Sequence, residues 1–141
     1  MQYKEFKENN KYFVKAWLNK AGRFHHEKLP SYISHYANGQ VCREEYYDNG
    51  FLHRVGDPAY KRYSEDGKLL CIKYMIRGNE HRKDGPAVIY YNYDESVSFE
   101  EFWVSGKFLG QGRLGFWRLW DKLNEKERNS IDILKLLSKF S

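Results

Sequence analysis

The side chains with the most chemical potential in this sequence are histidines, arginines and aspartates that occur close together more than once. His81, Arg82 and Asp84 place a base, a cation and an acid within four residues, which suits general acid–base catalysis. A catalytic group needs one preorganised pocket, however, and a similar set recurs around His53. We therefore expect no catalytic residue and no enzyme activity.

Zinc binding is the other chemistry that histidines support. His25, His53 and His81 lie 28 residues apart, and in repeated hairpins such positions would be two strands, about 9 to 10 Å, from one another. Zinc ligands lie only about 2.0 to 2.3 Å from the ion. His25 and His26 could supply two ligands, but no cysteine or carboxylate has a spacing that completes the site. We expect no metal and no cofactor.

We expect the recurring residues to close loops instead. The arginines would bond a carboxylate or backbone carbonyls, and the prolines would fix φ before the following strand. The imidazoles would bridge loop carbonyls. The predicted structural loop residues are His53, Arg54, Asp57, Pro58, His81, Arg82, Asp84 and Pro86.

These loops belong to a repeat of 28 residues. That interval separates the glycines at positions 22, 50, 78 and 106 and the prolines at positions 30, 58 and 86. It also separates the turn pairs Asn38-Gly39, Asp66-Gly67 and Asp94-Glu95, and Asn10-Lys11 lies one step earlier. The chain therefore divides into a repeat domain, residues 1–112, and a C-terminal segment, residues 113–141. The domain holds a partial unit at about 11–22 and full units at 22–49, 50–77 and 78–105.

Each unit is expected to fold as one β-hairpin. Runs rich in β-branched and aromatic residues, such as 59–63 and 87–91, lead into the turn pairs. A second run follows, at 41–47, 69–76 or 97–104, and ends at the glycine ladder, where we expect positive φ. The fold class is thus mainly β, an antiparallel meander of repeated hairpins in a single twisted sheet with a C-terminal helical cap. Large aromatic side chains fall on both faces of these strands, so the sequence alone does not indicate which face of the sheet is buried.

The C-terminal segment is predicted to be helical and to pack on the sheet. Apolar residues between Phe116 and Leu123 have helical spacing. Residues 124–127 resemble a capping box, and Ser130 could cap a further run whose shared face carries Ile133, Leu134, Leu137 and Phe140. Repeat arrays need atypical ends that cover their last edge. The alternative is that this amphipathic segment docks a partner.

The repeat unit reads Gly-x-x-His-Arg-x-x-(Asp/Gly)-Pro-Ala, followed by a strand, a turn and a second strand. It stands as Gly50 to Ala59 and again as Gly78 to Ala87. Residues 11–109 resemble MORN-like repeats, in particular the variant with His-Arg-x-Asp-Gly-Pro-Ala loops in uncharacterised proteins of tailed phages and large DNA viruses. The first full unit departs from the pattern, with His26 in place of the arginine. The resemblance implies a hairpin sheet used for scaffolding or binding, without a reaction.

The composition is that of a folded and mildly basic chain. Its 141 residues carry 24 Lys and Arg against 19 Asp and Glu, a net charge of +5, with 4 Trp, 12 Tyr and 9 Phe. No apolar run approaches the about 20 residues of a membrane span, and the charged N-terminus lacks the pattern of a secretory signal. We expect a cytoplasmic protein, in the host cytoplasm if it is viral, with no membrane partner.

The leading hypothesis is a non-catalytic module that binds another protein. Its specific form would be a small phage or viral inhibitor of a host enzyme or defence complex. Exposed aromatic and arginine side chains commonly anchor such interfaces. The candidate binding surface consists of Tyr60, Arg62, Tyr63, Tyr90, Tyr91 and Trp103.

The main alternative is a sheet that binds single-stranded nucleic acid. Residues 60–63 interleave tyrosines with Lys and Arg, which would stack bases and neutralise phosphates. Acidic pairs at 44–45 and 100–101 fall within strands, where they would repel a phosphate backbone. An antitoxin-like member of the same repeat class is a third hypothesis, and it predicts a toxin gene beside this one.

Overall fold

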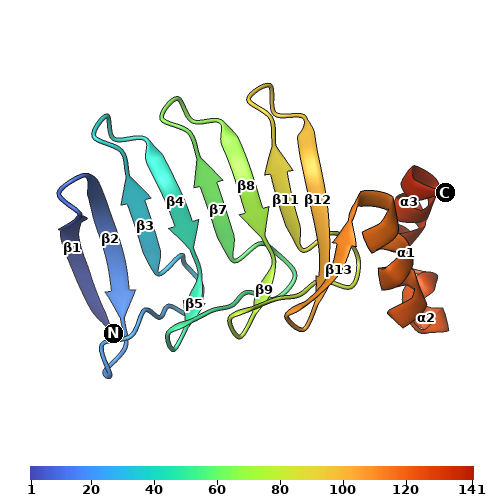
Figure 1. Ribbon diagram of the computed structural model, residues 1–141. Coiled ribbons are helices and arrows are strands. Elements are labelled where there is room, and N and C mark those ends of the chain that lie inside the picture. Colours follow the sequence, from blue (N-terminus) through green and yellow to red (C-terminus); the bar gives the residue numbers. More distant parts are fainter.

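The computed structural model describes residues 1–141, and its largest feature is one antiparallel sheet of nine strands. Figure 1 shows these strands side by side in chain order, with three helices beyond the last strand. The prediction of a mainly β meander is therefore confirmed. The strands are β1 (Gln2–Glu8), β2 (Tyr12–Leu18), β3 (Tyr32–His35), β4 (Val41–Glu45), β7 (Tyr60–Tyr63), β8 (Leu69–Lys73), β11 (Val88–Tyr91), β12 (Val97–Val104) and β13 (Lys107–Gln111).

The tips of the β3–β4, β7–β8 and β11–β12 hairpins use the same turn. Gly39, Gly67 and Glu95 occupy its left-handed position, with φ of 87°, 88° and 70°. A register shift beside each tip accommodates the extra residue, as expected for a turn followed by a bulge. Neighbouring tips are also joined, because the Tyr36 hydroxyl donates to the Tyr63 carbonyl at 2.6 Å. The turn ladder of the sequence thus sets the register of the sheet.

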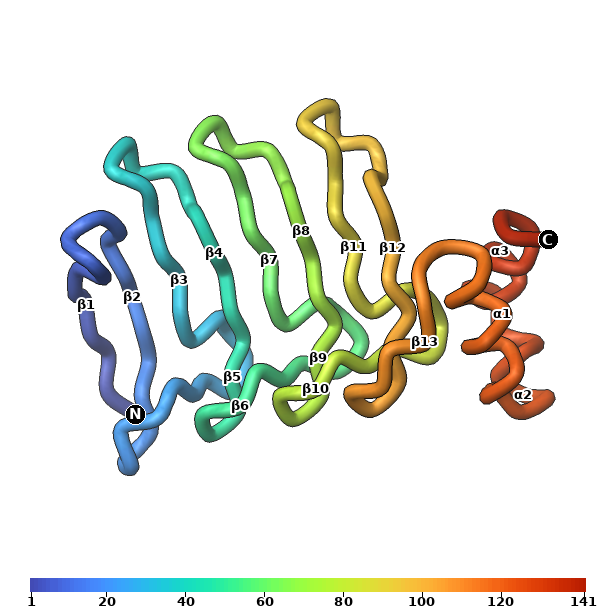
Figure 2. Tube along the Cα trace, viewed as in Figure 1, coloured from blue at the N-terminus to red at the C-terminus, as the bar shows by residue number.

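A second and shorter hairpin in each unit corrects the expectation of one hairpin per unit. The main strands expected at 41–47 and 69–76 end before Tyr46 and Tyr74, whose amides still donate to the Ala59 and Ala87 carbonyls in register with the neighbouring strand. The chain then forms the pairs β5 (Tyr47–Asp48) with β6 (Phe51–Leu52) and β9 (Met75–Ile76) with β10 (Asn79–Glu80). Figure 2 shows these short hairpins along the edge opposite the main tips.

Three of the four laddered glycines lie in short turns of one kind, and the fourth, Gly22, has φ of 77° in the turn that follows β2. Gly50 and Gly78 have φ of 90° and 81°, and Gly106 has φ of 78° in the matching turn between β12 and β13. The residue before each of them also has positive φ, so each turn has the two left-handed positions that match the twist of a hairpin. The predicted positive φ of this ladder is confirmed.

The N-terminal unit is a complete hairpin and not the partial unit expected at 11–22. Strand β1 pairs with all seven residues of β2, and Asn9 and Asn10 make the turn with φ of 56° and 55°. Asparagine tolerates this conformation better than most side chains. β1 has no preceding His-Arg loop, so the ladders that reveal the other units do not reach it.

The helical segment packs against the C-terminal end of the sheet. Its helices are α1 (Gly112–Lys122), α2 (Glu125–Arg128) and α3 (Ile131–Phe140). Phe102 of β12 is buried against Phe116, and Lys139 of α3 pairs with the buried Glu100 of β12. The capping box at Asn124 and the Ser130 cap are present as predicted.

One residue of α3 departs from the predicted apolar face. Leu134 is 46% exposed, whereas Leu136 joins Ile133, Leu137 and Phe140 at the helical core. The buried stripe is therefore rotated toward Leu136. None of the helices is long and apolar enough to cross a membrane.

Candidate functional site

The register of the sheet divides the six predicted surface residues between two faces. Cross-strand partners share a face, and Arg43, Arg62, Cys71, Tyr90 and Phe99 are successive partners across five strands. We call the side that they share face A and the opposite side face B. Tyr60 shares face A with Arg62 by the alternation of the strand.

Trp103 also lies on face A, but the other two candidates do not. The Trp103 indole donates to Glu101, two residues earlier on the same strand, at 3.1 Å. Tyr63 and Tyr91, next in sequence to Arg62 and Tyr90, point to face B. The six residues therefore do not form one surface, which corrects the sequence-based grouping.

One arginine of face A is fully engaged by its neighbours. Arg43 donates to the Tyr32 hydroxyl at 2.9 Å and lies 3.3 Å from Glu45 and 3.6 Å from Glu8. Glu45 is buried and also accepts from Tyr47 at 2.9 Å. Burial raises the pKa of Glu45, although Arg43 and Tyr47 favour its ionised form. This network joins β1, β3 and β4 and leaves Arg43 little capacity for a ligand.

Arg62, directly opposite Arg43, is not engaged in this way. Its guanidinium makes no hydrogen bond or ion pair, and neither do the hydroxyls of Tyr60 and Tyr90. Lys73 lies over the Tyr60 ring at 4.9 Å, and Tyr90 stacks on Phe99 at 4.4 Å. We call Tyr60, Arg62, Lys73, Tyr90 and Phe99 the Arg62 cluster. It offers unpaired donors among half-buried rings.

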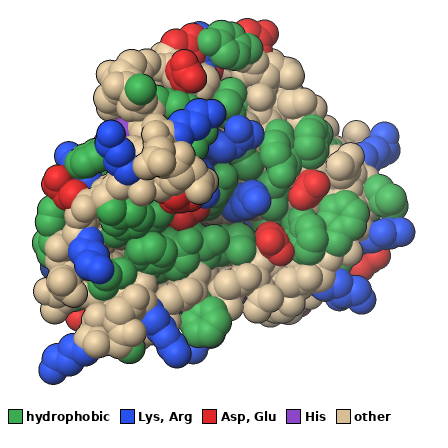
Figure 3. All heavy atoms as spheres, turned by 60° about the vertical axis from the view of Figure 1, so that its left-hand side comes forward, with side chains coloured by type: hydrophobic (Ala, Val, Ile, Leu, Met, Phe, Trp, Pro, Cys, Tyr) green, Lys and Arg blue, Asp and Glu red, His purple; other side chains and the backbone are tan.

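One side of the molecule combines hydrophobic and basic side chains. Figure 3 shows hydrophobic side chains gathered in a broad band over the molecule, with Lys and Arg side chains among them. Burial raises the pKa of Tyr60 and of Tyr90, so both hydroxyls remain donors at neutral pH. Burial likewise raises the pKa of the Cys71 thiol between Arg62 and Tyr90. An un-ionised, buried thiol is a packing group and a poor nucleophile.

On the loop edge, the laddered histidines bond backbone amides and not the loop carbonyls that we expected. The Nδ1 atoms of His25, His53 and His81 accept from the amides of Asn49, Arg77 and Ser105 at 3.0, 3.0 and 2.9 Å. Each histidine thereby fixes the next short turn of the chain, 24 residues further on. An amide can only donate, so Nδ1 is unprotonated and the ring proton resides on Nε2.

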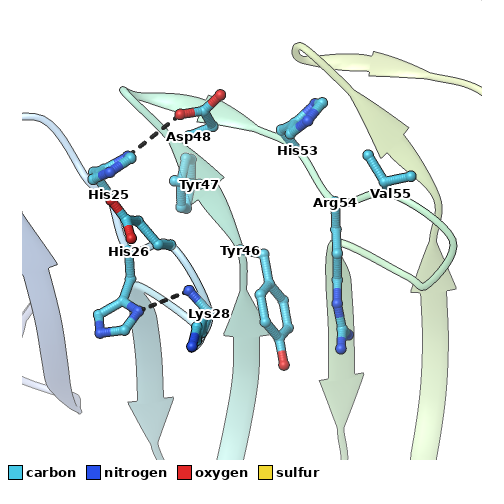
Figure 4. A pocket seen from close by; sticks show the side chains of 10 residues that line it. His25, His26, Lys28, Tyr46, Tyr47, Asp48, His53, Arg54 and Val55 are labelled. Atoms are coloured by element: carbon cyan, nitrogen blue, oxygen red, sulfur yellow. Dashed lines mark hydrogen bonds and ion pairs between the residues drawn. The ribbon is translucent and has the colours of Figure 1, made fainter.

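The laddered arginines stack on tyrosines. The guanidinium carbon of Arg54 lies 3.9 Å from the centre of the Tyr46 ring, and Arg82 repeats this distance over Tyr74. Figure 4 shows Arg54 running alongside Tyr46. Arg54 also donates to the Pro58 carbonyl at 3.2 Å, and Arg82 donates to the corresponding Pro86 carbonyl at 3.1 Å.

The two loop aspartates, one in each of the similar His-Arg sets, do not occupy equivalent positions. Asp84 accepts from Arg82 Nε at 3.0 Å, whereas Asp57 lies 3.9 Å from Arg54. Asp57 lies 28 residues before Gly85, so Gly85 is its equivalent in the following unit. A Cβ at Gly85 would lie 2.7 Å from the guanidinium carbon of Arg82, which is the movable end of a flexible side chain. Arg54 makes the same stack and carbonyl bond beside Asp57, so these contacts do not require a glycine.

The loop of the first full unit has a different construction. His26, in place of the arginine, accepts from the amides of Lys28 and Leu29 at 3.0 and 2.8 Å. Its ring packs edge-on against Trp17, with centres 5.4 Å apart. Figure 4 shows His26 beside His25 at one end of the row of loops.

A shallow groove runs along these loops. Three pockets of about 450, 330 and 270 Å³ follow one another, and the first two share Arg54 and Val55. The second and third share Lys83 and Asp84. We call this row the loop groove. Its lining includes the laddered histidines and both arginine–tyrosine stacks.

No protein-family model, curated protein or solved structure matches this chain. Within the chain itself, no group of three or more His, Cys, Asp or Glu side chains is placed to hold a metal ion.

Sequence reasoning missed Lys73 and Phe99 of the Arg62 cluster and Val55 and Lys83 of the loop groove. Lys73 and Phe99 come beside Tyr60 and Tyr90 only through cross-strand pairing. The turn ladder contains enough information to find them, because a turn of known length fixes which residues pair. No pattern in the sequence marks Val55 or Lys83.

Proposed function

We propose that this chain is a non-catalytic binding module that holds a protein partner on face A, centred on the Arg62 cluster. The observation that supports this is an arginine without a partner among tyrosine and phenylalanine rings near the middle of the sheet. Arginine and tyrosine are enriched among the residues that dominate protein–protein binding energies. The rings are already held by stacking and by Lys73, so little ordering is required on binding.

The chemistry of the cluster defines the partner's contact. Five guanidinium donors of Arg62 match a carboxylate, which can accept two of them side by side. The hydroxyls of Tyr60 and Tyr90 add donors on either side. We therefore propose that the partner presents an Asp or Glu side chain, framed by apolar atoms, to the Arg62 cluster.

Several finer features of the proposal rest on the sequence alone. They are a MORN-like scaffold, a cytoplasmic location, and a role as a small phage or viral inhibitor of a host enzyme or defence complex. The His-Arg loops support the first, and the similar loops of phage and viral proteins support the last.

A photo-crosslinking experiment tests the proposed surface. p-Benzoylphenylalanine is placed at Tyr90 on face A or at the adjacent Tyr91 on face B, and each protein is irradiated in a host extract. We expect one protein of the extract to crosslink reproducibly at position 90 and not to crosslink at position 91. Crosslinking of that protein from position 91 alone would place the interface on face B and overturn the proposal.

An arginine variant with a matched control tests the energetics. Arg62→Ala should weaken capture of the crosslinked partner by about tenfold or more, as truncation of a central interface residue commonly does. Lys61→Ala removes a charge from the same strand on face B and should leave capture unchanged. Equal effects of both variants would indicate general electrostatic attraction.

Single-stranded nucleic acid is the second candidate, favoured by Arg62 and Lys73 lying beside tyrosine rings. Glu45 and Glu101 on the same face oppose phosphates. A labelled oligothymidine that binds the protein, and loses affinity steeply between about 50 and about 200 mM salt, would support this candidate over a protein partner.

A further inference from the structure

We infer that the loop groove is a second binding site, and that it takes an extended, proline-rich segment in the polyproline II conformation. The site is separate from the Arg62 cluster on face A. It shares no residue with that cluster, so either proposal can fail without the other.

The spacing of the groove matches this conformation. Loops repeat in step with the sheet, because the Arg54 and Arg82 amides donate to the Met75 and Trp103 carbonyls near the end of their own units, both at 3.1 Å. One unit spans two strand spacings, about 9.4 to 9.8 Å. A polyproline II helix advances about 9.3 Å in one turn of three residues. Every third residue of such a segment therefore meets the same position in successive units.

Other extended or helical ligands do not have this period. Side chains on one side of a β-strand recur every two residues, about 6.6 Å, and an α-helix advances about 5.4 Å per turn. Either ligand would lose register with the groove after one unit. The period thus selects a three-residue repeat.

Hydrogen-bond donors recur in the groove at the same interval. His25, His53 and His81 line its first two pockets, and each carries its proton on Nε2 because Nδ1 accepts a backbone amide. No contact in the chain uses those Nε2 donors. A polyproline II segment makes no internal hydrogen bonds, so its carbonyls need donors, and prolines have no N–H that would need an acceptor.

The groove also offers apolar surface without a structural role. Val55 is 77% exposed and lines two adjacent pockets, beside the stacked rings of Tyr46 and Tyr74. Nothing in the fold requires a valine at this exposed loop position. Proline rings pack well on such a wall of aromatic and aliphatic groups, as in other grooves that recognise proline-rich segments.

The charges of the groove favour an uncharged ligand over nucleic acid. In the first pocket, Lys28 and Arg54 are balanced by Glu27 and Asp48. In the second, Arg54, Arg82 and Lys83 outnumber Asp84, but over the three pockets together four cations meet five carboxylates. The third pocket contains Glu127 and Asp132, which would repel phosphates. A proline-rich backbone meets no such repulsion.

An NMR titration of the ¹⁵N-labelled full chain with deca-L-proline tests the inference. This probe is about 31 Å long, enough to cross all three pockets. We expect shifts confined to the loops that carry Val55 and Lys83 and to the Arg54 and Arg82 side chains. A Gly-Ser decapeptide, which is flexible and has N–H groups, should produce no shifts.

Variants then test the location. Val55→Asp should weaken deca-proline binding by about tenfold or more, since it places a charge in the apolar contact. Leu114→Asp changes an exposed leucine of α1 outside the groove and should leave binding unchanged. Arg62→Ala should also leave it unchanged, because that residue lies on face A.

Three results would overturn the inference. They are absence of any shift with deca-proline, equal shifts with the Gly-Ser peptide, or shifts that map to face A. Stronger shifts of the same loop signals with oligothymidine would assign the groove to nucleic acid instead. The comparison of peptides on the unmodified protein decides the question even if Val55→Asp unfolds.

Discussion

His81 connects the protonation of one side chain to the stability of the fold. Burial, aided by Lys83, lowers the pKa of His81 below its ordinary 6.5, and Nδ1 must stay unprotonated to accept the Ser105 amide. As the pH falls below about 6.5, the unfolded chain takes up a proton at this position before the folded chain does. The stability that His81 contributes is therefore complete above that pH and is lost as the pH falls. Urea denaturation should show lower stability at about pH 5.5 than at about pH 7.5.

An isosteric acceptor isolates this contribution. In His81→Asn, the side-chain oxygen can accept the Ser105 amide but does not titrate, so the loss of stability at low pH should shrink. His81→Ala should cost about 0.5 to 1.5 kcal/mol at neutral pH through the lost hydrogen bond. If the stability of His81→Asn depended on pH as that of the parent does, other titrating groups would be the cause of the loss at low pH.

Arg82 illustrates why the repeat contains arginine and not simply a cation. It stacks on Tyr74 at 3.9 Å, donates to the Pro86 carbonyl at 3.1 Å and bonds Asp84 at 3.0 Å. A lysine ammonium cannot make these planar contacts together. Arg82→Lys should therefore cost about 1 to 3 kcal/mol of unfolding free energy in urea denaturation. Lys83→Arg next to it changes only a surface ion pair and should cost less than about 0.5 kcal/mol.

At the scale of elements, the contact between α1 and the end of the sheet depends on one glycine. A Cβ at Gly115 would lie 2.2 Å from the Gly110 carbonyl oxygen and 2.7 Å from Phe102. Alanine favours a helix over glycine by about 1 kcal/mol, yet here it would push α1 away from β13. Gly115→Ala should therefore destabilise the protein by about 1 to 3 kcal/mol, as overpacking does.

A neighbouring substitution provides the matched control for this helix. Leu114 is 56% exposed, so Leu114→Ala should change the stability by less than about 0.5 kcal/mol. Thermal unfolding followed by circular dichroism measures both variants. A Gly115→Ala variant as stable as the parent would mean that α1 has room to move away from the sheet.

At the scale of the molecule, the sheet follows from the sequence because its turns recur in phase. Glycines and turn pairs at one interval specify where each main hairpin reverses, and hydrophobic strands between them leave few alternatives. The short hairpins were not predicted, since residues 41–47 and 69–76 each appear as one uninterrupted strand. The strands end at Tyr46 and Tyr74 because of a tertiary contact, in which each tyrosine ring packs against an arginine of the following loop.

The candidate surfaces were less predictable than the fold. Alternation along a strand places the neighbours Tyr90 and Tyr91 on opposite faces. Aromatic residues fall on both parities of each strand, however, so the sequence alone does not show which of the two faces is buried. The role of the histidines as amide acceptors also escaped prediction, because their partners lie 24 residues away in the next turn.

The equivalence of the repeats leads to a prediction about the whole chain. In a repeat array each unit contacts only its neighbours, so removal of one whole unit leaves every remaining interface intact. Deletion of residues 50–77 joins Asn49 to Gly78, which can bond the Phe24 carbonyl as Gly50 does at 2.9 Å. We expect a folded protein with a smaller urea m-value, since less surface is exposed on unfolding. Deletion of residues 50–63 removes half a unit and brings β4 next to β8, which runs in the same direction, so the antiparallel pair cannot form and this variant should not fold. If the full-unit deletion also failed to fold in circular dichroism and urea denaturation, the units would not be interchangeable and stability would reside in contacts specific to residues 50–77.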